Sequence, residues 1–320
     1  MRTYSLSPRE FRPKLKNLTE FLSDTQLNAK IIFGTSEDGK NTRLSYAVLK
    51  KDTVNDYRKE FISNIENYSD KDPVQYGISD FEADTYQYLI AGDIPQATTF
   101  LKDPQNPVRN LDSTFIKSIR FTEFRFQNTN GAVMAVFKIY LKTHFLTSGN
   151  RFKFFLEDSV LTPFTKDVIV APPRFDCILF NNVMFIFKKS NFERIFDYKK
   201  VFQAKATAVF AYFEKPKGYT IEGLEPIRAK CMKSRSRMRR LAIISQGAYR
   251  TFTFDQLANF SKQKGLKDPS FDLKNRMMKF QTTRAFFRLF EDMYVHSELT
   301  DTDYIASRKT RLRASTTVSL

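Results

Sequence analysis

Two short apolar runs separated by a pair of asparagines dominate the hydrophobic pattern of the chain. The runs cover Phe175–Phe180 and Val183–Phe187, and Asn181 and Asn182 stand between them. Asparagine tolerates positive φ, so this pair is typical of a two-residue hairpin turn. Nearly every position of both runs is apolar, which predicts strands buried on both faces of a sheet.

The hydrophobic period changes directly after this hairpin. Ser190 is a typical helix N-cap, and Glu193 lies three residues further on, which is the spacing of a capping box. The positions that then recur at helical spacing are Phe192, Ile195, Phe196, Lys199 and Phe202. We therefore expect one helix from Ser190 to about residue 213.

Short segments before the hairpin predict the rest of a sheet, with two helices. One helix is expected within residues 14–27 and another from Asp52, because both segments place apolar side chains on one helical face. Strands are expected at residues 30–33, 42–49, 116–126, 133–143, 151–157 and 167–170. The resulting sheet is mostly antiparallel, and the fold class is α+β.

A break in the pattern lies at residues 215–224, KPKGYTIEGL, which contain two glycines and one proline. We place a domain boundary there. Residues 1–214 form an α+β domain for assembly and partner docking, and residues 215–320 form a basic, mainly helical domain. One apolar helical face is expected from Leu224, Ile227, Cys231, Met238 and Leu241. Shorter helices are expected at residues 254–264, 273–280 and 284–294.

Composition narrows the type of protein. Phenylalanine accounts for 33 of 320 residues and tryptophan is absent, which predicts a core packed mainly by phenylalanine. The two cysteines, Cys177 and Cys231, are too few for a disulfide framework or a zinc cluster. Residues 1–14 lack the apolar core of a secretory signal, and no apolar run reaches the roughly 20 residues of a membrane span. We expect a soluble protein of the reducing cytoplasm.

The charge is distributed unevenly along the chain. The net charge is +17, yet residues 1–214 carry 30 basic and 25 acidic side chains, whereas residues 215–320 carry 22 and 10. The excess of positive charge therefore belongs mainly to the last third, and it predicts a polyanionic partner.

The densest basic stretch is residues 228–240, where seven of thirteen side chains are cationic and none is acidic. With no acid on the same segment to offset their repulsion, we expect a polyanion to bind them. We interpret the stretch, with a second basic group near residue 310, as a surface that contacts DNA phosphates without reading bases. The predicted DNA-binding residues are Arg228, Lys230, Lys233, Arg235, Arg237, Arg239, Arg240, Arg308, Lys309, Arg311 and Arg313. The alternatives are an acidic lipid or protein surface and a merely solvated face.

Neither a loop with phosphate-binding spacing nor the two histidines predict a functional site. Residues 34–41, GTSEDGKN, have the spacing of such a loop, but Asn41 stands where Ser or Thr would bind Mg²⁺. Glu37 and Asp38 would repel phosphate, and a strand rather than a helix follows, so we predict a hairpin turn. We interpret His144 and His296 as structural positions rather than a catalytic pair.

Carboxylates near predicted strand ends offer an enzymatic alternative. If the fold brought two or three of them together, they would suit Mg²⁺ and nucleic-acid cleavage. The residues concerned are Glu157, Asp158, Asp167 and Asp176. Their spacing is not diagnostic, because acids are common at strand ends. We therefore predict no catalytic centre, metal or cofactor, and we keep a metal-dependent nuclease as the alternative.

Two segments resemble a known protein family. The hairpin and its helix, FDCILFNNVMFIFKKSNFERIFDY, are similar to the strand–turn–strand and N-F-E-x-I-F-x-Y helix start of the KwaB-like family of the bacterial Kiwa antiphage system. Near the end of the chain, Leu299, Thr300 and Tyr304, followed by residues 309–312, resemble the closing pattern of that family. The resemblance covers about two thirds of the chain, and the first 110 residues match only in general layout.

This resemblance implies a cytoplasmic antiviral protein that binds DNA and forms a homodimer. It also implies a membrane partner resembling KwaA, which would hold the protein at the inner membrane surface. It supplies no catalytic residues. We therefore expect an effector that clamps invading DNA and blocks its replication or transcription, and a basic adaptor docked on the membrane is the remaining alternative.

Overall fold

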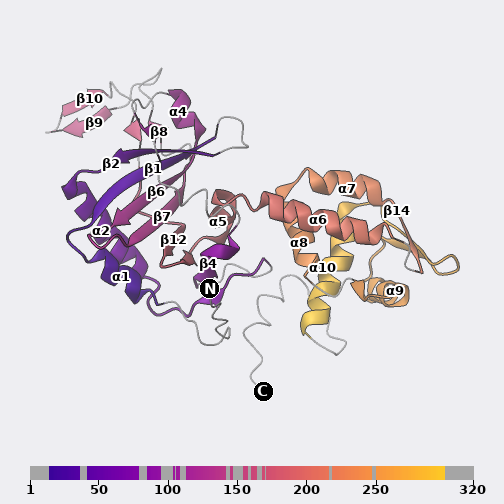
Figure 1. The fold of residues 1–320 in the computed structure, drawn as a ribbon. Helices are drawn as coiled ribbons and strands as arrows, with labels where there is room; N and C mark the ends of the chain where they lie inside the picture. The colour runs from indigo at the N-terminus through magenta and orange to yellow at the C-terminus, as the bar shows by residue number, and fades with distance from the viewer. Residues whose placement is uncertain are drawn as a thin grey trace. The chain divides into compact units, whose positions relative to one another are not determined.

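The structure is a computed structural model with two compact units (Figure 1). It describes residues 14–36, 42–78, 85–94, 104, 106–108, 113–141, 145–146, 154–157, 160–163, 168–169, 171–215, 218–246 and 250–299. The first unit comprises Met1–Tyr76 and Glu82–Asp197, and the second comprises Gly77–Phe81 and Tyr198–Leu320.

A mixed sheet of nine strands forms the first unit, in the order β3-β4-β13-β12-β7-β6-β1-β2-β5. Its strands are β1 (Asn28–Thr35), β2 (Arg43–Val48), β3 (Val74–Gln75), β4 (Gln87–Ile90), β5 (Asn106–Pro107), β6 (Ile119–Gln127), β7 (Val133–Ile139), β12 (Cys177–Phe180) and β13 (Val183–Ile186). Neighbours pair antiparallel except at the edges, where β3 runs parallel to β4 and β5 parallel to β2. Two separate antiparallel pairs join β9 (Phe154–Glu157) to β10 (Val160–Pro163) and β8 (Phe145–Leu146) to β11 (Val168–Ile169). The predicted α+β class is confirmed.

The predicted hairpin is the β12–β13 pair. Asn181 and Asn182 have φ values of 47° and 64°, as a two-residue turn with both central residues at positive φ requires. All eight strand positions are buried, and each strand has a second neighbour in the sheet, β7 beside β12 and β4 beside β13. The uninterrupted apolar pattern therefore reflects a hairpin in the middle of the sheet with both of its faces covered.

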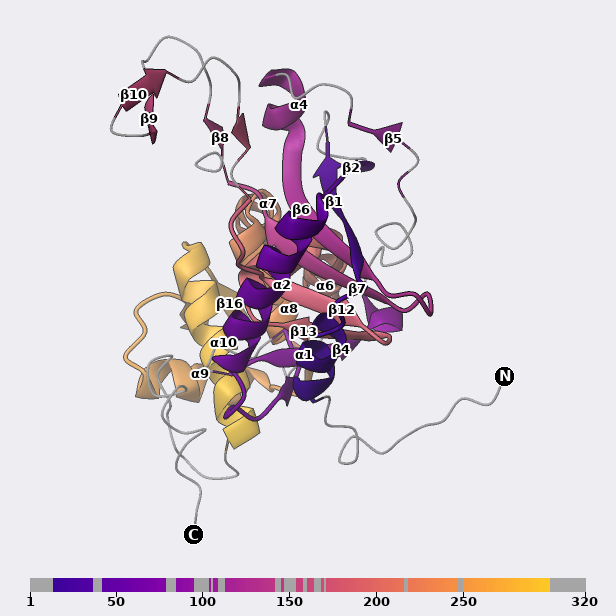
Figure 2. The same cartoon turned by 90° about the vertical axis from the view of Figure 1, so that its left-hand side faces the viewer.

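Helices cover both faces of this sheet. On one face lie α1 (Lys16–Leu22) and α2 (Lys51–Glu66), seen in front of the strands in Figure 2. Phe61 of α2 packs on Phe124 of β6, with ring centroids 5.4 Å apart. The short α5 (Lys189–Ile195) is followed by Phe196, whose ring lies 5.3 Å from Phe137 of β7. Phe137 pairs with Glu123, the neighbour of Phe124, so it faces the opposite side of the sheet.

Two predicted elements of the first unit are wrong in detail. The helix expected from Ser190 to residue 213 is interrupted at Asp197, which has a φ of 49°. Ser190 is not its cap, because α5 already begins at Lys189 and no side chain caps it. Residues 116–118, predicted to start a strand, lie instead in α4 (Ser113–Ser118).

The second unit combines helices with a three-stranded sheet. Its elements are α6 (Lys199–Phe213), α7 (Leu224–Met232), α8 (Arg235–Ile244), α9 (Phe254–Gln263), α10 (Thr283–Leu299), β14 (Thr220–Glu222), β15 (Ser270–Asp272) and β16 (Met277–Lys279). Phenylalanine packs its core, as predicted: the Phe213 ring lies 4.4 Å from Phe290 and 5.6 Å from Phe286. The predicted apolar face from Leu224 to Leu241 is buried, although Lys233 and Ser234 divide it between two helices.

Two segments of this unit differ from the prediction. Residues 273–280, expected to be helical, contain β16, and the interrupting segment 215–224 contains β14. The chain passes from the first unit to the second between Asp197 and Tyr198, so α6 belongs to the second unit. The predicted domain boundary lies one helix later, at residue 215.

Gly223 gives a test of this second unit. It caps the start of α7 with a φ of 75°, and a Cβ atom there would collide with the backbone carbonyl of Phe280. The Gly223→Ala variant is expected to lose about 2 kcal/mol of unfolding free energy, because both strain and overpacking oppose it. Urea unfolding checks this. Gly218→Ala is the control, since its φ is 74° but its Cβ meets open space, and an equal loss in both variants would refute the collision.

Candidate nucleic-acid interface

The basic stretch 228–240 spans the end of α7, the turn at Lys233 and Ser234, and most of α8. Helix α8 packs against α6, α7 and α10, and it buries Met238, Leu241 and the residues that follow. A helix enclosed in this way brings part of its cationic side chains to the protein interior. Each arginine therefore has to be judged by its own contacts.

Arg240 is a partly buried residue whose guanidinium is engaged by the protein. Its guanidinium lies 3.8 Å from the ring centroid of Phe287, and its Nε donates to Glu291 Oε2 at 2.9 Å. Its Nη2 donates to the same oxygen. Glu291 is only 4% exposed, so this carboxylate depends on Arg240 for its partner charge.

The other arginines of the stretch also contact the protein. Arg228 Nη1 donates to Glu214 Oε1 at 2.7 Å. Arg237 and Arg239 donate to backbone carbonyls, those of Lys230 at 3.0 Å and Ile78 at 3.1 Å. Acids from outside the stretch therefore compensate part of its charge, because Glu214 pairs with Arg228 and Glu291 with Arg240. The prediction of uncompensated repulsion was wrong for these two arginines.

Four lysines in the same region remain exposed. Lys230 and Lys233 end α7, and Lys199 and Lys200 begin α6. Over the residues that the structure describes, none of the four ammonium groups has an ion-pair partner. Lys199 and Lys200 are absent from the residues predicted to bind DNA, because the predicted boundary assigned them to the first domain.

These lysines lie close to the start of α8. The Arg235 guanidinium lies 6.0 Å from the ring centroid of Phe202, one turn after Lys199. Arg237 joins the start of α8 to the Lys230 carbonyl at the end of α7. We call this group the basic end of the second unit: Lys199, Lys200, Lys230, Lys233, Arg235 and Arg237. The starts of α6 and α8 both lie here, and their helix dipoles add to the positive potential.

The remaining predicted DNA-binding residues cannot be placed in this surface. Arg308, Lys309, Arg311 and Arg313 lie outside the described residues. Their assignment stays a prediction.

The alternative carboxylate site is not assembled from the residues that the structure describes. Asp176 is fully buried, with Oδ1 3.0 Å from Lys138 Nζ and Oδ2 accepting the backbone N–H of Ile139 at 2.7 Å. Asp158 and Asp167 lie outside the described residues, as does the side chain of Glu157. Across the described ranges, no three His, Cys, Asp or Glu side chains form a metal-binding group.

The remaining sequence patterns have structural explanations or fall outside the described ranges. Gly34 lies within β1 and is followed by the antiparallel β2, as predicted for a hairpin rather than a phosphate loop. A Cβ atom on Gly34 would collide with the Phe121 ring, which explains the glycine. His144 and the side chain of His296 lie outside the described part of the chain.

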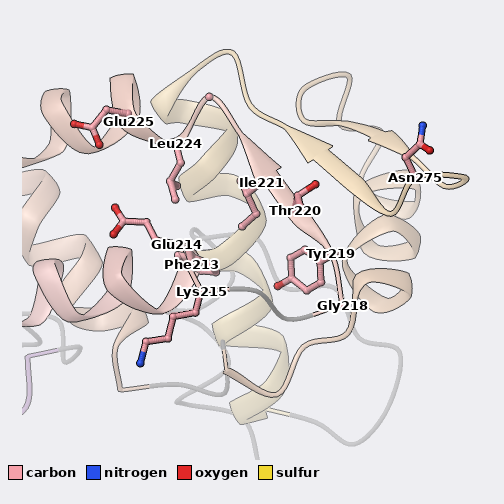
Figure 3. Close-up of a pocket in the computed structure, with 11 residues that line it drawn as sticks. Phe213, Glu214, Lys215, Gly218, Tyr219, Thr220, Ile221, Leu224, Glu225 and Asn275 are labelled. Carbon is pink, nitrogen blue, oxygen red and sulfur yellow. The ribbon is translucent and has the colours of Figure 1, made fainter.

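A cavity of about 730 Å³ opens in the second unit (Figure 3). Phe213, Ile221 and Leu224 line it with apolar surface, and Glu214 and Glu225 supply carboxylates. Lys215 also lines the cavity, and Glu214 is paired with Arg228, so the cavity lacks the excess of positive charge that the basic end has. We do not assign the DNA contact to it.

Both thiols are buried, and neither is suited to nucleophilic or metal chemistry. Burial raises the pKa of the Cys177 thiol well above its ordinary range, and the Asp176 carboxylate adds to the effect. Burial also raises the pKa of Cys231 to about 11, opposed by Arg237 and Arg240. A thiol reagent needs the thiolate, so native protein reacts slowly.

The raised thiol pKa values predict alkaline destabilisation. An unfolded cysteine loses its proton near pH 8.5, whereas folded Cys231 keeps it until about pH 11. Its contribution to stability is therefore complete below about pH 8.5 and is lost as the pH rises towards 11. Urea midpoints are expected to fall over this range, and to fall less in Cys231→Ala. Equal declines in both proteins would contradict the assignment to this thiol.

Comparison with known proteins places the chain in a family context. A family model described as Kiwa protein KwaB-like matches residues 116–300, more than half of the 320 residues. The match runs from the second half of α4 through β6, the hairpin and the helices α6 to α10. No curated protein and no solved structure matches the chain. Over the described residues, none of the helices has the length and apolarity that a membrane span requires.

Proposed function

This chain belongs to the Kiwa protein KwaB-like family, and on that premise we propose that it binds DNA through its second unit. Membership implies a role in Kiwa antiphage defence. The proposed action is to hold invading DNA by its sugar–phosphate backbone and obstruct replication or transcription. Cleavage is not part of this proposal, and the protein would need no metal or cofactor.

The observation that carries the proposal is the charge of the second unit. Residues 198–320 contain 25 basic and 11 acidic side chains, a larger imbalance than in the rest of the chain. Contacts of lysine and arginine with phosphate are independent of base sequence and release counterions. The protein is therefore expected to bind unrelated duplexes with similar affinity.

We further propose partners in line with the family. A membrane protein resembling KwaA would recruit the chain to the inner membrane surface, and the chain itself would act as a cytoplasmic homodimer. The support for them is membership of a family that is part of the Kiwa system, which implies partner proteins in general.

The test is a salt titration of DNA binding by the full-length protein, with and without Mg²⁺. Tight binding that weakens linearly in log–log plots, with intact DNA recovered on a gel, is the expected result. Recovery of cleaved DNA would refute this proposal and favour the alternative of a metal-dependent nuclease. Binding to acidic vesicles that excess DNA does not displace would replace it with the membrane adaptor.

A further inference from the structure

We propose that the basic end of the second unit is the phosphate-binding site, and that the arginines of α8 mainly build and position it. This inference rests on the proposed DNA binding and deepens it. It assigns the phosphate contact to four lysines at the ends of two helices. Two of these lysines, Lys199 and Lys200, lie outside the stretch 228–240.

Three helices converge at this site. Phe202 is fully buried in α6, and the Arg235 guanidinium at the start of α8 lies 6.0 Å from its ring centroid. Lys199 stands three residues before Phe202 and so shares its side of α6, and Lys200 follows it in the first turn of that helix. Helix α7 ends at the same place, because only Lys233 and Ser234 separate it from α8. Cations that are distant in sequence therefore lie together.

Internal contacts hold this surface in place. The Arg237 guanidinium bonds to the Lys230 carbonyl, and the Ser234 N–H bonds to the Cys231 carbonyl at 3.0 Å. These bonds fix the turn that carries Lys233. A fixed turn presents its cations without the ordering cost that a flexible segment pays on binding.

The exposed groups suit a chain of phosphates. Lysine ammonium groups are compact, strongly hydrated charges that bind phosphate without a fixed fork geometry. Several such groups spread over three helix ends suit a row of successive phosphodiesters. They suit a single enclosed anion less well. Arg228 and Arg240, by contrast, already hold carboxylates at Glu214 and Glu291. The ligand class is therefore the backbone of a nucleic acid, contacted by its phosphates.

The experiment compares two full-length variants with the same loss of charge. The first replaces Lys199, Lys200, Lys230 and Lys233 with glutamine, which keeps good helix propensity. The control replaces four other exposed lysines of the unit with glutamine: Lys215, Lys262, Lys267 and Lys274. Affinity for a fluorescent duplex of arbitrary sequence is measured against salt concentration.

The first variant is expected to bind at least about tenfold more weakly near physiological salt, with a log–log slope smaller by about 0.9 for each phosphate that is no longer neutralised. The control variant keeps a slope close to that of the wild-type protein. Equal losses in both variants would overturn the inference and show that binding depends on net charge alone. Wild-type slope and affinity in the first variant would overturn the site but leave DNA binding standing. Failure of the wild-type protein to bind DNA would instead refute the proposed function.

Discussion

The Asp176→Ala variant is expected to lose about 3–5 kcal/mol of unfolding free energy, because it leaves Lys138 as a buried charge without its partner. Asp176 is fully buried, and the Lys138 residue is 8% exposed. The variant also loses the bond at 2.7 Å from the Ile139 N–H to Oδ2. Asp176 immediately precedes β12, so the loss falls on the junction between β7 and the central hairpin. Urea unfolding measures the effect.

Two further variants separate this ion pair from a general effect of charge. Asp70→Ala removes an exposed carboxylate of the same unit and is expected to change stability by less than about 0.5 kcal/mol. The double variant Asp176→Leu/Lys138→Met removes both charges and is expected to recover part of the loss. If Asp176→Ala proves as stable as Asp70→Ala, the buried ion pair contributes nothing. The prediction also bears on the nuclease alternative, because any loss of cleavage in this variant must first be corrected for unfolding.

The central hairpin could be predicted because its determinants are local. The turn needs two residues that tolerate positive φ, and Asn181 and Asn182 supply them in adjacent positions. Burial on both faces leaves a continuous apolar run in the sequence. Pattern and conformation therefore agree without reference to distant residues.

Two errors arose where an apolar period fits more than one structure. Residues 273–280 place Leu273, Met277 and Phe280 at helical spacing, yet they form a turn and a strand. The turn is fixed by Asn275, whose backbone N–H and side chain both bond to Asp272, and by Arg276 at a φ of 48°. The break at Asp197 is likewise a positive φ at a residue other than glycine, which hydrophobic periodicity does not reveal.

The candidate site could be located in the sequence but not resolved into roles. Seven cations within residues 228–240 indicated a polyanion partner. Some of these cations bond to other parts of the protein instead of to solvent. Their partners are Glu214, Glu291 and the Ile78 carbonyl, which all lie outside the stretch. Such contacts follow from helix packing, and a single sequence carries no direct sign of them. The DNA-binding residues expected from charge alone therefore include structural arginines.

The Arg240→Ala variant tests this division of roles. It leaves the Glu291 carboxylate buried without its cation and removes the stacking on Phe287. Breaking a buried ion pair typically costs about 3–5 kcal/mol, and because the Arg240 side chain is 28% exposed we expect about 2–4 kcal/mol here. Urea unfolding of the second unit measures the loss. Lys233→Ala, which removes an exposed charge from the neighbouring turn, is expected to change stability by less than about 0.5 kcal/mol.

The two variants should show the opposite order in DNA binding. Under conditions where both are folded, Lys233→Ala is expected to reduce the salt slope by about 0.9, while Arg240→Ala leaves it unchanged. A double variant, Arg240→Met/Glu291→Leu, should restore stability, because it removes both charges and keeps apolar volume against Phe287. A reduced slope in folded Arg240→Ala would show that its guanidinium reaches DNA phosphate despite Glu291. Full stability in that variant would show that Glu291 does not need a cation, and the separation between structural arginines and phosphate-binding lysines would then fail.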